Sequence, residues 1–279
     1  MPLYTMKEIL SDAKSKKYGV GYYNCVSVEM VRAFVRASED AKSPVIIGTA
    51  ESLLRYCDFG WLAPIMFSAA RGAKIPVAIH LDHAYSFDTV MKALRYGFGS
   101  VMFDGSTLPL EENIRVCAEI SKAAHPMGAG LESELGKVGG LPEGGGTIGE
   151  NQLTDAGTAS LFIEKTDTDF LAVSIGTTHG EYKEPPNLDF DRLAEIRAKT
   201  EIPLVLHGGS GLTDDDFRKC IAEGVQKINI HTDIVTAAIE AIREHAGSLD
   251  YADLLQKTEE AIYLTVLEKI KVFGSGNMA

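Results

Sequence analysis

Short hydrophobic stretches recur through almost the whole chain, and the segments between them carry apolar residues at the spacing of amphipathic helices. The stretches are continuously apolar rather than alternating, which is typical of parallel strands covered on both faces. They predict strands over residues 18–24, 44–49, 76–82, 100–104, 128–135, 170–178, 203–207 and 227–230. Helices are predicted over residues 27–37, 61–70, 87–96, 110–124 and 156–164, and a helical pattern follows each later strand.

Eight strand–helix units in one continuous series favour a TIM (β/α)8 barrel, formed by residues 1–279 as a single domain. An open, doubly wound sheet is the second candidate, since the periodicity does not distinguish a closed sheet from an open one. After the eighth unit, residues 251–273 predict a further helix, so that a helical extension at about 250–273 has no strand to cover. We expect this extension to pack on the barrel side or on a second subunit.

Composition narrows the possible partners. The formal net charge of −12 leaves no basic excess to neutralise phosphates, which argues against nucleic acid. A small phosphorylated ligand remains possible, because backbone N–H groups can bind one locally. The four cysteines are far apart, the N-terminus lacks a signal-peptide core, and no apolar run reaches membrane-spanning length. We therefore expect a cytoplasmic protein with reduced thiols and no membrane association.

Histidines close three of the predicted strands. His83 follows Asp82 after the third strand, His179 follows the sixth, and His207 ends the seventh. Parallel strands in one barrel would bring their carboxyl ends together, where barrel enzymes place their chemistry. Three neutral imidazoles with an open position are a common way to hold a catalytic Zn²⁺. The other histidines are expected to be structural, and His231 is the only one of them expected near the site.

Turns follow the seventh and eighth strands at the usual phosphate-binding position of a barrel, and the first of the two is rich in glycine. They are Gly208 to Gly211 and Asn229 to Thr232, with Thr213 and Asp233 as expected caps of the helices that follow. Residues 136–147 are too long and too rich in glycine for a simple turn, and loops of this kind often cover a site.

Several carboxylates are expected at the same rim. Asp82 stands beside a candidate ligand, where it could orient an imidazole or exchange a proton with a substrate oxygen. Asp104 on the fourth strand and Glu132 and Glu134 on the fifth could position ligands or bind a second cation.

Five motifs occur in the order found in class II, metal-dependent fructose-bisphosphate/tagatose-bisphosphate aldolases, which the chain resembles from Tyr4 to Ser275. They are residues 80–83 (HLDH), 132–136 (ESELG) with Gly139 and Gly140, 176–180 (GTTHG), 207–211 (HGGSG) and 229–233 (NIHTD). The resemblance implies a TIM barrel that assembles as a homodimer or homotetramer. It also implies reversible aldol cleavage of a ketose 1-phosphate or 1,6-bisphosphate to dihydroxyacetone phosphate and an aldehyde.

The same resemblance implies roles for individual residues. His83, His179 and His207 would bind Zn²⁺, Asp82 would exchange the hydroxyl proton, and Glu143 is nearest to the family's lid glutamate. Asp104 and Glu134 match carboxylates that can hold a second metal, and Na⁺ or K⁺ is expected near the phosphate. The residues expected to bind dihydroxyacetone phosphate are Gly180, Gly208, Gly209, Ser210, Asn229, Ile230, His231 and Thr232.

Ala50, Glu181 and the lid sequence at residues 141–143 depart from the family pattern and leave the aldehyde half open. Fructose and tagatose bisphosphate rank first, and a modified ketose such as 6-deoxy-6-sulfofructose 1-phosphate is the alternative. A non-catalytic sugar-phosphate-binding barrel is a remote alternative. A Schiff-base aldolase would need a lysine within a late strand. The predicted sixth strand has none, and Lys227 is expected at the far end of the eighth strand from the site.

Overall fold

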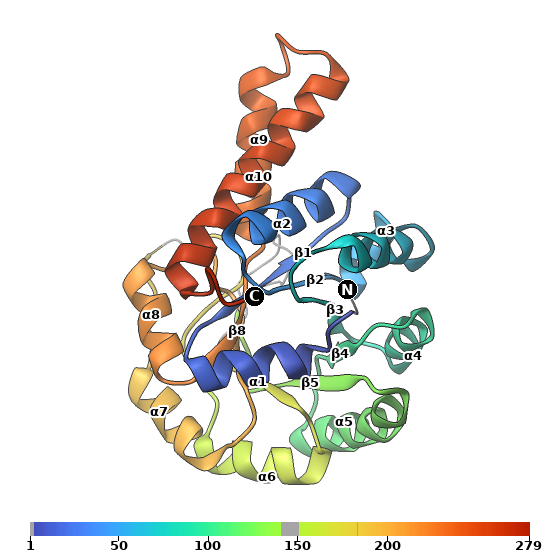
Figure 1. Ribbon diagram of the computed structural model, residues 1–279. Coiled ribbons are helices and arrows are strands. Elements are labelled where there is room, and N and C mark those ends of the chain that lie inside the picture. Colours follow the sequence, from blue (N-terminus) through green and yellow to red (C-terminus); the bar gives the residue numbers. More distant parts are fainter. Residues whose placement is uncertain (1–2, 141–150, 183) are drawn as a thin grey trace.

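A closed barrel of eight parallel strands, β1 to β8 in chain order, forms the centre of the molecule (Figure 1). The computed structural model describes residues 3–140, 151–182 and 184–279. Pairing between β8 and β1, with Tyr22 opposite Asn229, closes the sheet, so the barrel prediction is confirmed and the doubly wound alternative is wrong. The strands are β1 (Val20–Asn24), β2 (Val45–Ala50), β3 (Val77–Ala84), β4 (Ser100–Phe103), β5 (Gly130–Leu135), β6 (Phe170–Val173), β7 (Leu204–Leu206) and β8 (Val225–Asn229).

Helices surround the barrel, and all six that were predicted with bounds, the one over residues 251–273 included, occur within a few residues of those bounds. The sequence pattern missed α1 and the two 3₁₀ turns. The helices are α1 (Met6–Lys16), α2 (Val28–Ala41), α3 (Phe59–Gly72), α4 (Phe87–Tyr96), α5 (Leu110–Ala124), α6 (Ala156–Thr166), α7 (Phe190–Lys199), α8 (Asp214–Ala222), α9 (Thr232–His245) and α10 (Tyr251–Phe273), with 3₁₀ turns η1 (Glu51–Arg55) and η2 (His125–Met127).

The helix starts follow local capping chemistry, with one informative difference. Thr213 caps α8 as predicted, in a reciprocal capping box with Asp216. Asp233 does not cap α9. The helix starts at Thr232, two residues earlier than a cap at Asp233 would give, and the hydroxyl of Ser210 accepts hydrogen bonds from the backbone N–H groups of His231 and Asp233 at 3.2 Å each. The turn after β7 therefore supplies the cap for the helix after β8.

Strand six is shorter than predicted. It ends at Val173, because the N–H of Ser174 donates to the hydroxyl of Thr154 at 2.8 Å instead of to a neighbouring strand. Gly176 then adopts a φ of +111° and turns the chain. His179 consequently lies in a loop, six residues beyond the end of the strand. It is held there by its backbone N–H, which donates to the carbonyl of Gly139 at 2.7 Å.

The barrel interior is apolar at one end and polar at the other. Alternate residues of each strand point inward, and α1 lies across the amino end of the barrel with its apolar face covering the opening (Figure 1). The apolar cluster at this end comprises Met6, Ile9, Leu10, Ala13, Tyr18, Val20, Tyr22, Ile46, Ala78, Met102, Phe170, Ala172 and Val205.

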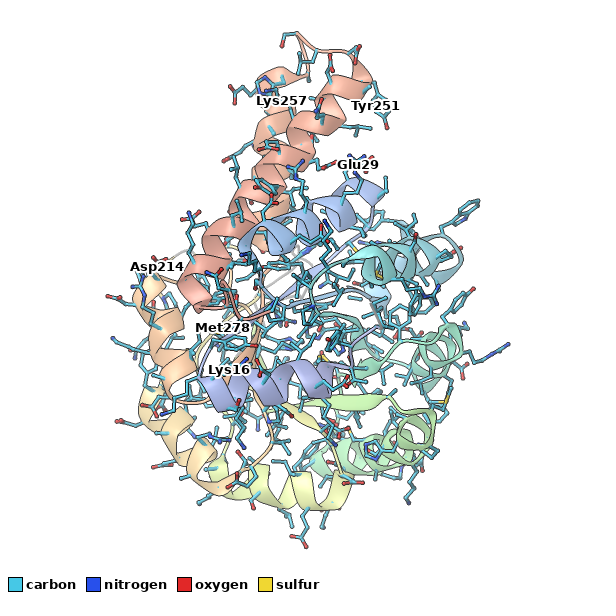
Figure 2. The ribbon with its side chains drawn as sticks, viewed as in Figure 1. Lys16, Glu29, Asp214, Tyr251, Lys257 and Met278 are labelled. Carbon is cyan, nitrogen blue, oxygen red and sulfur yellow. The ribbon has the colours of Figure 1, made fainter. Side chains whose placement is uncertain are left out.

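The helices α9 and α10 form an antiparallel arm that extends beyond the barrel (Figure 1). The carboxyl-terminal half of α10 packs on the barrel side, as one of the two expectations had it, with Ile262, Val266 and Ile270 buried. The other end projects, and Figure 2 shows Tyr251 and Lys257 near its tip. Among the residues described, no helix is long and apolar enough to cross a bilayer.

Candidate active site

A β-bulge in β3 points two consecutive residues at one site. Neighbouring strand residues normally face opposite sides of a sheet. The pairing of β3 with β4 shifts between Leu81 and Ala84, and His83 adopts a φ of +34°, which is rare for a residue with a side chain. Both Asp82 and His83 are therefore buried at the carboxyl end of the barrel, only 1% exposed.

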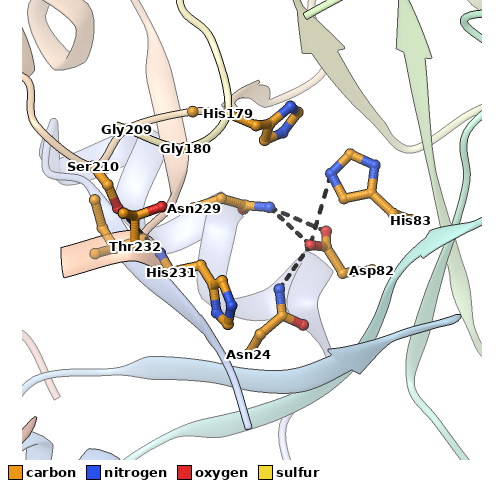
Figure 3. Close-up of a pocket in the computed structure, with 12 residues that line it drawn as sticks. Asn24, Asp82, His83, His179, Gly180, Gly209, Ser210, Asn229, His231 and Thr232 are labelled. Carbon is orange, nitrogen blue, oxygen red and sulfur yellow. Dashed lines mark hydrogen bonds and ion pairs between the residues drawn. The ribbon is translucent and has the colours of Figure 1, made fainter. Parts of the chain in front are cut away.

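Three imidazoles converge beside Asp82. His83 from β3, His179 from the loop after β6 and His207 from the end of β7 each offer a nitrogen within 4.8 Å of the other two. The rings meet edge to face, with centroids 4.5 Å apart for His83 and His207 and 5.1 Å apart for His83 and His179. Figure 3 shows His83 and His179 next to Asp82 in the pocket.

In each of the three rings, one nitrogen is directed at an oxygen acceptor outside the cluster. His83 Nδ1 lies 2.9 Å from Asp104, His207 Nε2 lies 2.9 Å from Glu132, and His179 Nδ1 lies 3.2 Å from the Gly139 carbonyl. Acceptors of this kind fix the tautomer and the rotation of metal-binding histidines. His83 Nε2, His207 Nδ1 and His179 Nε2 are thereby left to face a shared ligand.

The electrostatics of the three rings are unequal. Burial is the largest cause that lowers the pKa values of His179 and His207 below the ordinary value. Burial acts on His83 too, but the surrounding carboxylates, Asp82 foremost, outweigh it and raise the pKa of His83 to about 10. A protonated His83 Nε2 facing a neutral His207 Nδ1 agrees with their separation of 2.8 Å.

The site fits a metal with three imidazole ligands. His179 Nε2 is buried and has no hydrogen-bond partner among the described residues, a costly condition for a ring nitrogen without a ligand. With His83 deprotonated, its Nε2 and the Nδ1 of His207 would join His179 Nε2 as donors to such an ion. Three nitrogen donors beside an open pocket match the donor set of a catalytic divalent metal.

Asp82 is held as an anion by two amide donors and by neighbouring positive charge. Its carboxylate accepts hydrogen bonds from the Asn24 amide at 3.2 Å and from the Asn229 amide at 3.0 Å. Burial alone would raise the pKa of Asp82, but His83 and Lys227 together hold it well below its usual range. Sequence reasoning missed Asn24, although a polar residue at the end of β1 is the same signal that identified the histidines.

All eight residues expected to bind the phosphorylated half line one pocket, together with Asn24, Asp82, His83 and His179 (Figure 3). Gly208 has a φ of +65°, and a Cβ there would lie 2.5 Å from the Thr178 carbonyl oxygen. Only glycine therefore lets the loop after β7 approach the loop that carries His179.

The expected second-metal carboxylates have specific contacts. Asp104 is directed at His83, so it orients a ring as well as bordering the site. Glu134 accepts the backbone N–H of Val138 at 3.1 Å through one oxygen, and burial raises its pKa to about 8. Together with His83, these two carboxylates form a second group of potential ligand atoms within 4.8 Å of one another. Glu143 lies outside the described residues.

Two expectations about buried residues were wrong. β8 begins at Val225, so Lys227 lies in mid-strand, and its ammonium reaches the barrel interior 3.7 Å from Asp82 rather than the far end. His231 is not the only further histidine near the site. His80 Nε2, inside the barrel, lies 3.7 Å from Asp82 and 3.5 Å from Glu132.

Comparison with known proteins agrees with this geometry. The family model described as "Fructose-bisphosphate aldolase class-II" matches residues 4–278. A "Probable fructose-bisphosphate aldolase" from Bacillus subtilis is 40% identical over the full length of both chains, and a "Fructose-bisphosphate aldolase" from Staphylococcus epidermidis is 39% identical.

Solved structures give the same result. The YdjI aldolase of Escherichia coli K12 superposes with a TM-score of 0.90 at 35% identity, covering 99% of this chain and 98% of that one. A putative fructose-1,6-bisphosphate aldolase from Coccidioides immitis superposes with a TM-score of 0.91 at 28% identity, covering 97% and 96%. The full-length family match, the closed barrel and the histidine cluster agree, and the chain belongs to the class II fructose-bisphosphate aldolase family, whose members are carbon–carbon lyases.

Proposed function

We propose that this aldolase catalyses the reversible cleavage of a ketose 1-phosphate or 1,6-bisphosphate to dihydroxyacetone phosphate and an aldehyde, using Zn²⁺ bound by His83, His179 and His207. The convergence of these imidazoles beside a buried Asp82 carries the proposal. Membership in this family argues against the non-catalytic sugar-phosphate-binding barrel and the Schiff-base aldolase.

In cleavage, Asp82 would remove the proton from the ketose hydroxyl next to the bond that breaks, and in condensation it would return the proton. The amides of Asn24 and Asn229 would hold the carboxylate during both steps. A bound zinc ion would supply positive charge near the oxygens of dihydroxyacetone phosphate, where negative charge develops. We assign the proton transfer at carbon to Glu143.

The phosphate would bind where the loops after β6, β7 and β8 meet, at the amino end of α9. The helix dipole and the backbone N–H groups favour an anion there. We propose that Gly180, Gly208, Gly209 and Ser210 contact it, together with residues 229–232, with Na⁺ or K⁺ close by. Asp104 and Glu134 would offer a second metal position next to His83.

Fructose and tagatose 1,6-bisphosphate are the proposed substrates, and the names of the curated relatives favour the first. The alternative is 6-deoxy-6-sulfofructose 1-phosphate. The test is to measure cleavage kcat/KM on all three with zinc-loaded enzyme. Release of dihydroxyacetone phosphate is expected from at least one, and its absence from all three would refute the substrate class. Treatment with a chelator should abolish the activity, and added zinc should restore it.

We also propose that the protein is a cytoplasmic homodimer or homotetramer assembled through the arm. The arm exposes large apolar side chains at Ile239 (44%), Ile242 (41%), Tyr251 (77%) and Leu264 (56%). Large exposed apolar side chains on one projecting element favour an association surface there. Sedimentation of wild-type protein and of a Tyr251→Ser, Leu264→Ser double variant tests the arm directly, because only the variant should yield monomers.

A further inference from the structure

A lysine lies fully buried inside the barrel, below the histidine cluster. Lys227 in β8 has no exposed surface, and its Nζ lies 3.0 Å and 2.9 Å from the two carboxylate oxygens of Glu132 in β5. The same nitrogen is 4.5 Å from the centre of the Tyr22 ring. The Glu132 carboxylate is also fully buried, so this ion pair bridges the barrel with neither partner in contact with water.

The buried ion pair between Lys227 and Glu132 is costly, so its presence calls for an explanation. Branched apolar side chains ordinarily fill these inward positions. Taking two charges out of water costs several kcal/mol per ion, and an apolar pair of similar volume is often as stable or more so. Stability alone is therefore a weak account of Lys227.

The ammonium also decides what else can bind here. His80, Asp82 and Glu132 form a buried group of potential metal ligands. Lys227 lies among them, 2.9 Å from Glu132 and 3.7 Å from Asp82. A side-chain cation thus occupies the position that a second ion could take, and the open histidine cluster above it remains the place for the metal.

The contacts lead from Lys227 to a proposed zinc ligand in two steps. Oε1 of Glu132 accepts both the Lys227 ammonium at 3.0 Å and the His207 Nε2–H at 2.9 Å. Accepting from Nε2–H leaves Nδ1 of His207 as the free donor atom, and that atom lies 2.8 Å from His83 Nε2. The orientation of the Glu132 carboxylate therefore decides which nitrogen His207 presents to the cluster.

We propose that Lys227 is a positioning residue of the metal centre: its ammonium fixes the Glu132 carboxylate, which in turn holds His207 with Nδ1 directed at the metal. This inference rests on the zinc site proposed above. Without the ammonium, Glu132 loses its bidentate partner, so its carboxylate is no longer fixed and no longer holds the His207 ring in one orientation.

The test uses zinc affinity instead of turnover. Apoprotein competes with a chromogenic chelator for Zn²⁺, and the visible spectrum of the Co²⁺ form reports the ligand geometry. Lys227→Met, which keeps the length of the side chain without its charge, should bind zinc about 10–100-fold more weakly, the usual cost of losing an outer-shell partner. Its Co²⁺ spectrum should differ from that of wild type. A folded Lys227→Met protein with wild-type affinity and spectrum would overturn the proposal.

A double-mutant cycle separates positioning from a general structural effect. Glu132→Gln keeps an oxygen that can accept from His207 but needs no cationic partner. In that background, Lys227→Met should change the zinc affinity less than about twofold. Equal losses in both backgrounds would refute the route through Glu132. The double variant buries no ion pair, so this arm stays informative even if Lys227→Met alone fails to fold.

Lys269→Met is the matched control. Lys269 is also a largely buried lysine, 14% exposed, and its ion pair with Asp233 at 2.6 Å has no contact with the histidine cluster. The zinc affinity of the Lys269→Met protein should equal that of wild type. Absence of zinc binding by the wild type itself would refute the proposed zinc site, whereas an unchanged Lys227→Met would refute only the positioning role.

Discussion

The two ends of the barrel interior use the same strands for opposite purposes. On β3, Ala78 belongs to the apolar cluster covered by α1, whereas Asp82, two inward positions further along, lies at the histidine cluster. On β7, Val205 and His207 divide in the same way. Mostly apolar side chains pack together at the amino end, whereas histidines, carboxylates and Lys227 gather at and just below the carboxyl end. We infer that the amino end stabilises the barrel and the carboxyl end binds and reacts.

This division predicts that substitutions at the two ends affect different measurements. Removing a metal ligand should have the largest effect. His207→Ala should lose turnover entirely and weaken zinc binding by more than about 100-fold, since loss of an outer-shell partner alone costs 10–100-fold. Metal analysis of the purified variant and steady-state assays check this.

His125→Ala is the control for that experiment. The Nε2 of His125 lies 2.9 Å from a carboxylate oxygen of Asp169, and His125 is not part of the histidine cluster. It should keep zinc and turnover. Full zinc content in His207→Ala would contradict the ligand assignment, as would the same result for His83→Ala or His179→Ala.

Asp82→Ala comes second in size. Asp82 is not one of the three proposed zinc ligands, so we expect zinc to remain bound in the variant. Its kcat should fall about 10²–10⁴-fold, the scale of a positioned acid or base. Asn24→Ala, which removes one amide donor to Asp82, should lower kcat less. Unchanged activity in Asp82→Ala would exclude the proton-transfer role.

Leu10→Ala tests the other end of the barrel. Leu10 of α1 is fully buried in the apolar cluster. Its truncation should lower the free energy of unfolding by about 2–5 kcal/mol. The kcat of the protein that stays folded should change little, because Leu10 is not among the residues that line the pocket. A large loss of kcat at full folding would show that the two ends are coupled.

The same contrast explains what the sequence could predict. Continuous apolar strands predict a parallel sheet because burial on both faces leaves a pattern in every strand, the series of eight units favours closure, and strand ends locate Asp82, His83 and His207. The pattern could not show that Lys227 lies in mid-strand and reaches the barrel interior, since β8 begins at Val225, two residues before the predicted start. Nor could it show that His179 stands in a loop, because that depends on Thr154 and Gly139, which are distant in sequence. The covering role of α1 is likewise a tertiary effect.

The remaining expected effect concerns protons at the reactive end. In the metal-free protein the pKa of His83 is raised to about 10, so below that pH a proton occupies the ring and zinc must displace it. That proton stabilises the metal-free fold fully below pH 6.5 and is lost as pH rises through about 10. Zinc affinity should therefore increase with pH between about 6 and 9, by roughly tenfold per unit for one displaced proton. Competition titrations at several pH values measure the slope.

A slope of two would mean that Glu134, whose pKa is raised to about 8, also gives up its proton to join the metal. Asp82→Asn removes the carboxylate that contributes most to the shift of His83 and should flatten the profile. A wild-type affinity that is the same at both ends of this range would show that His83 is already neutral, and the charged cluster would need a different account.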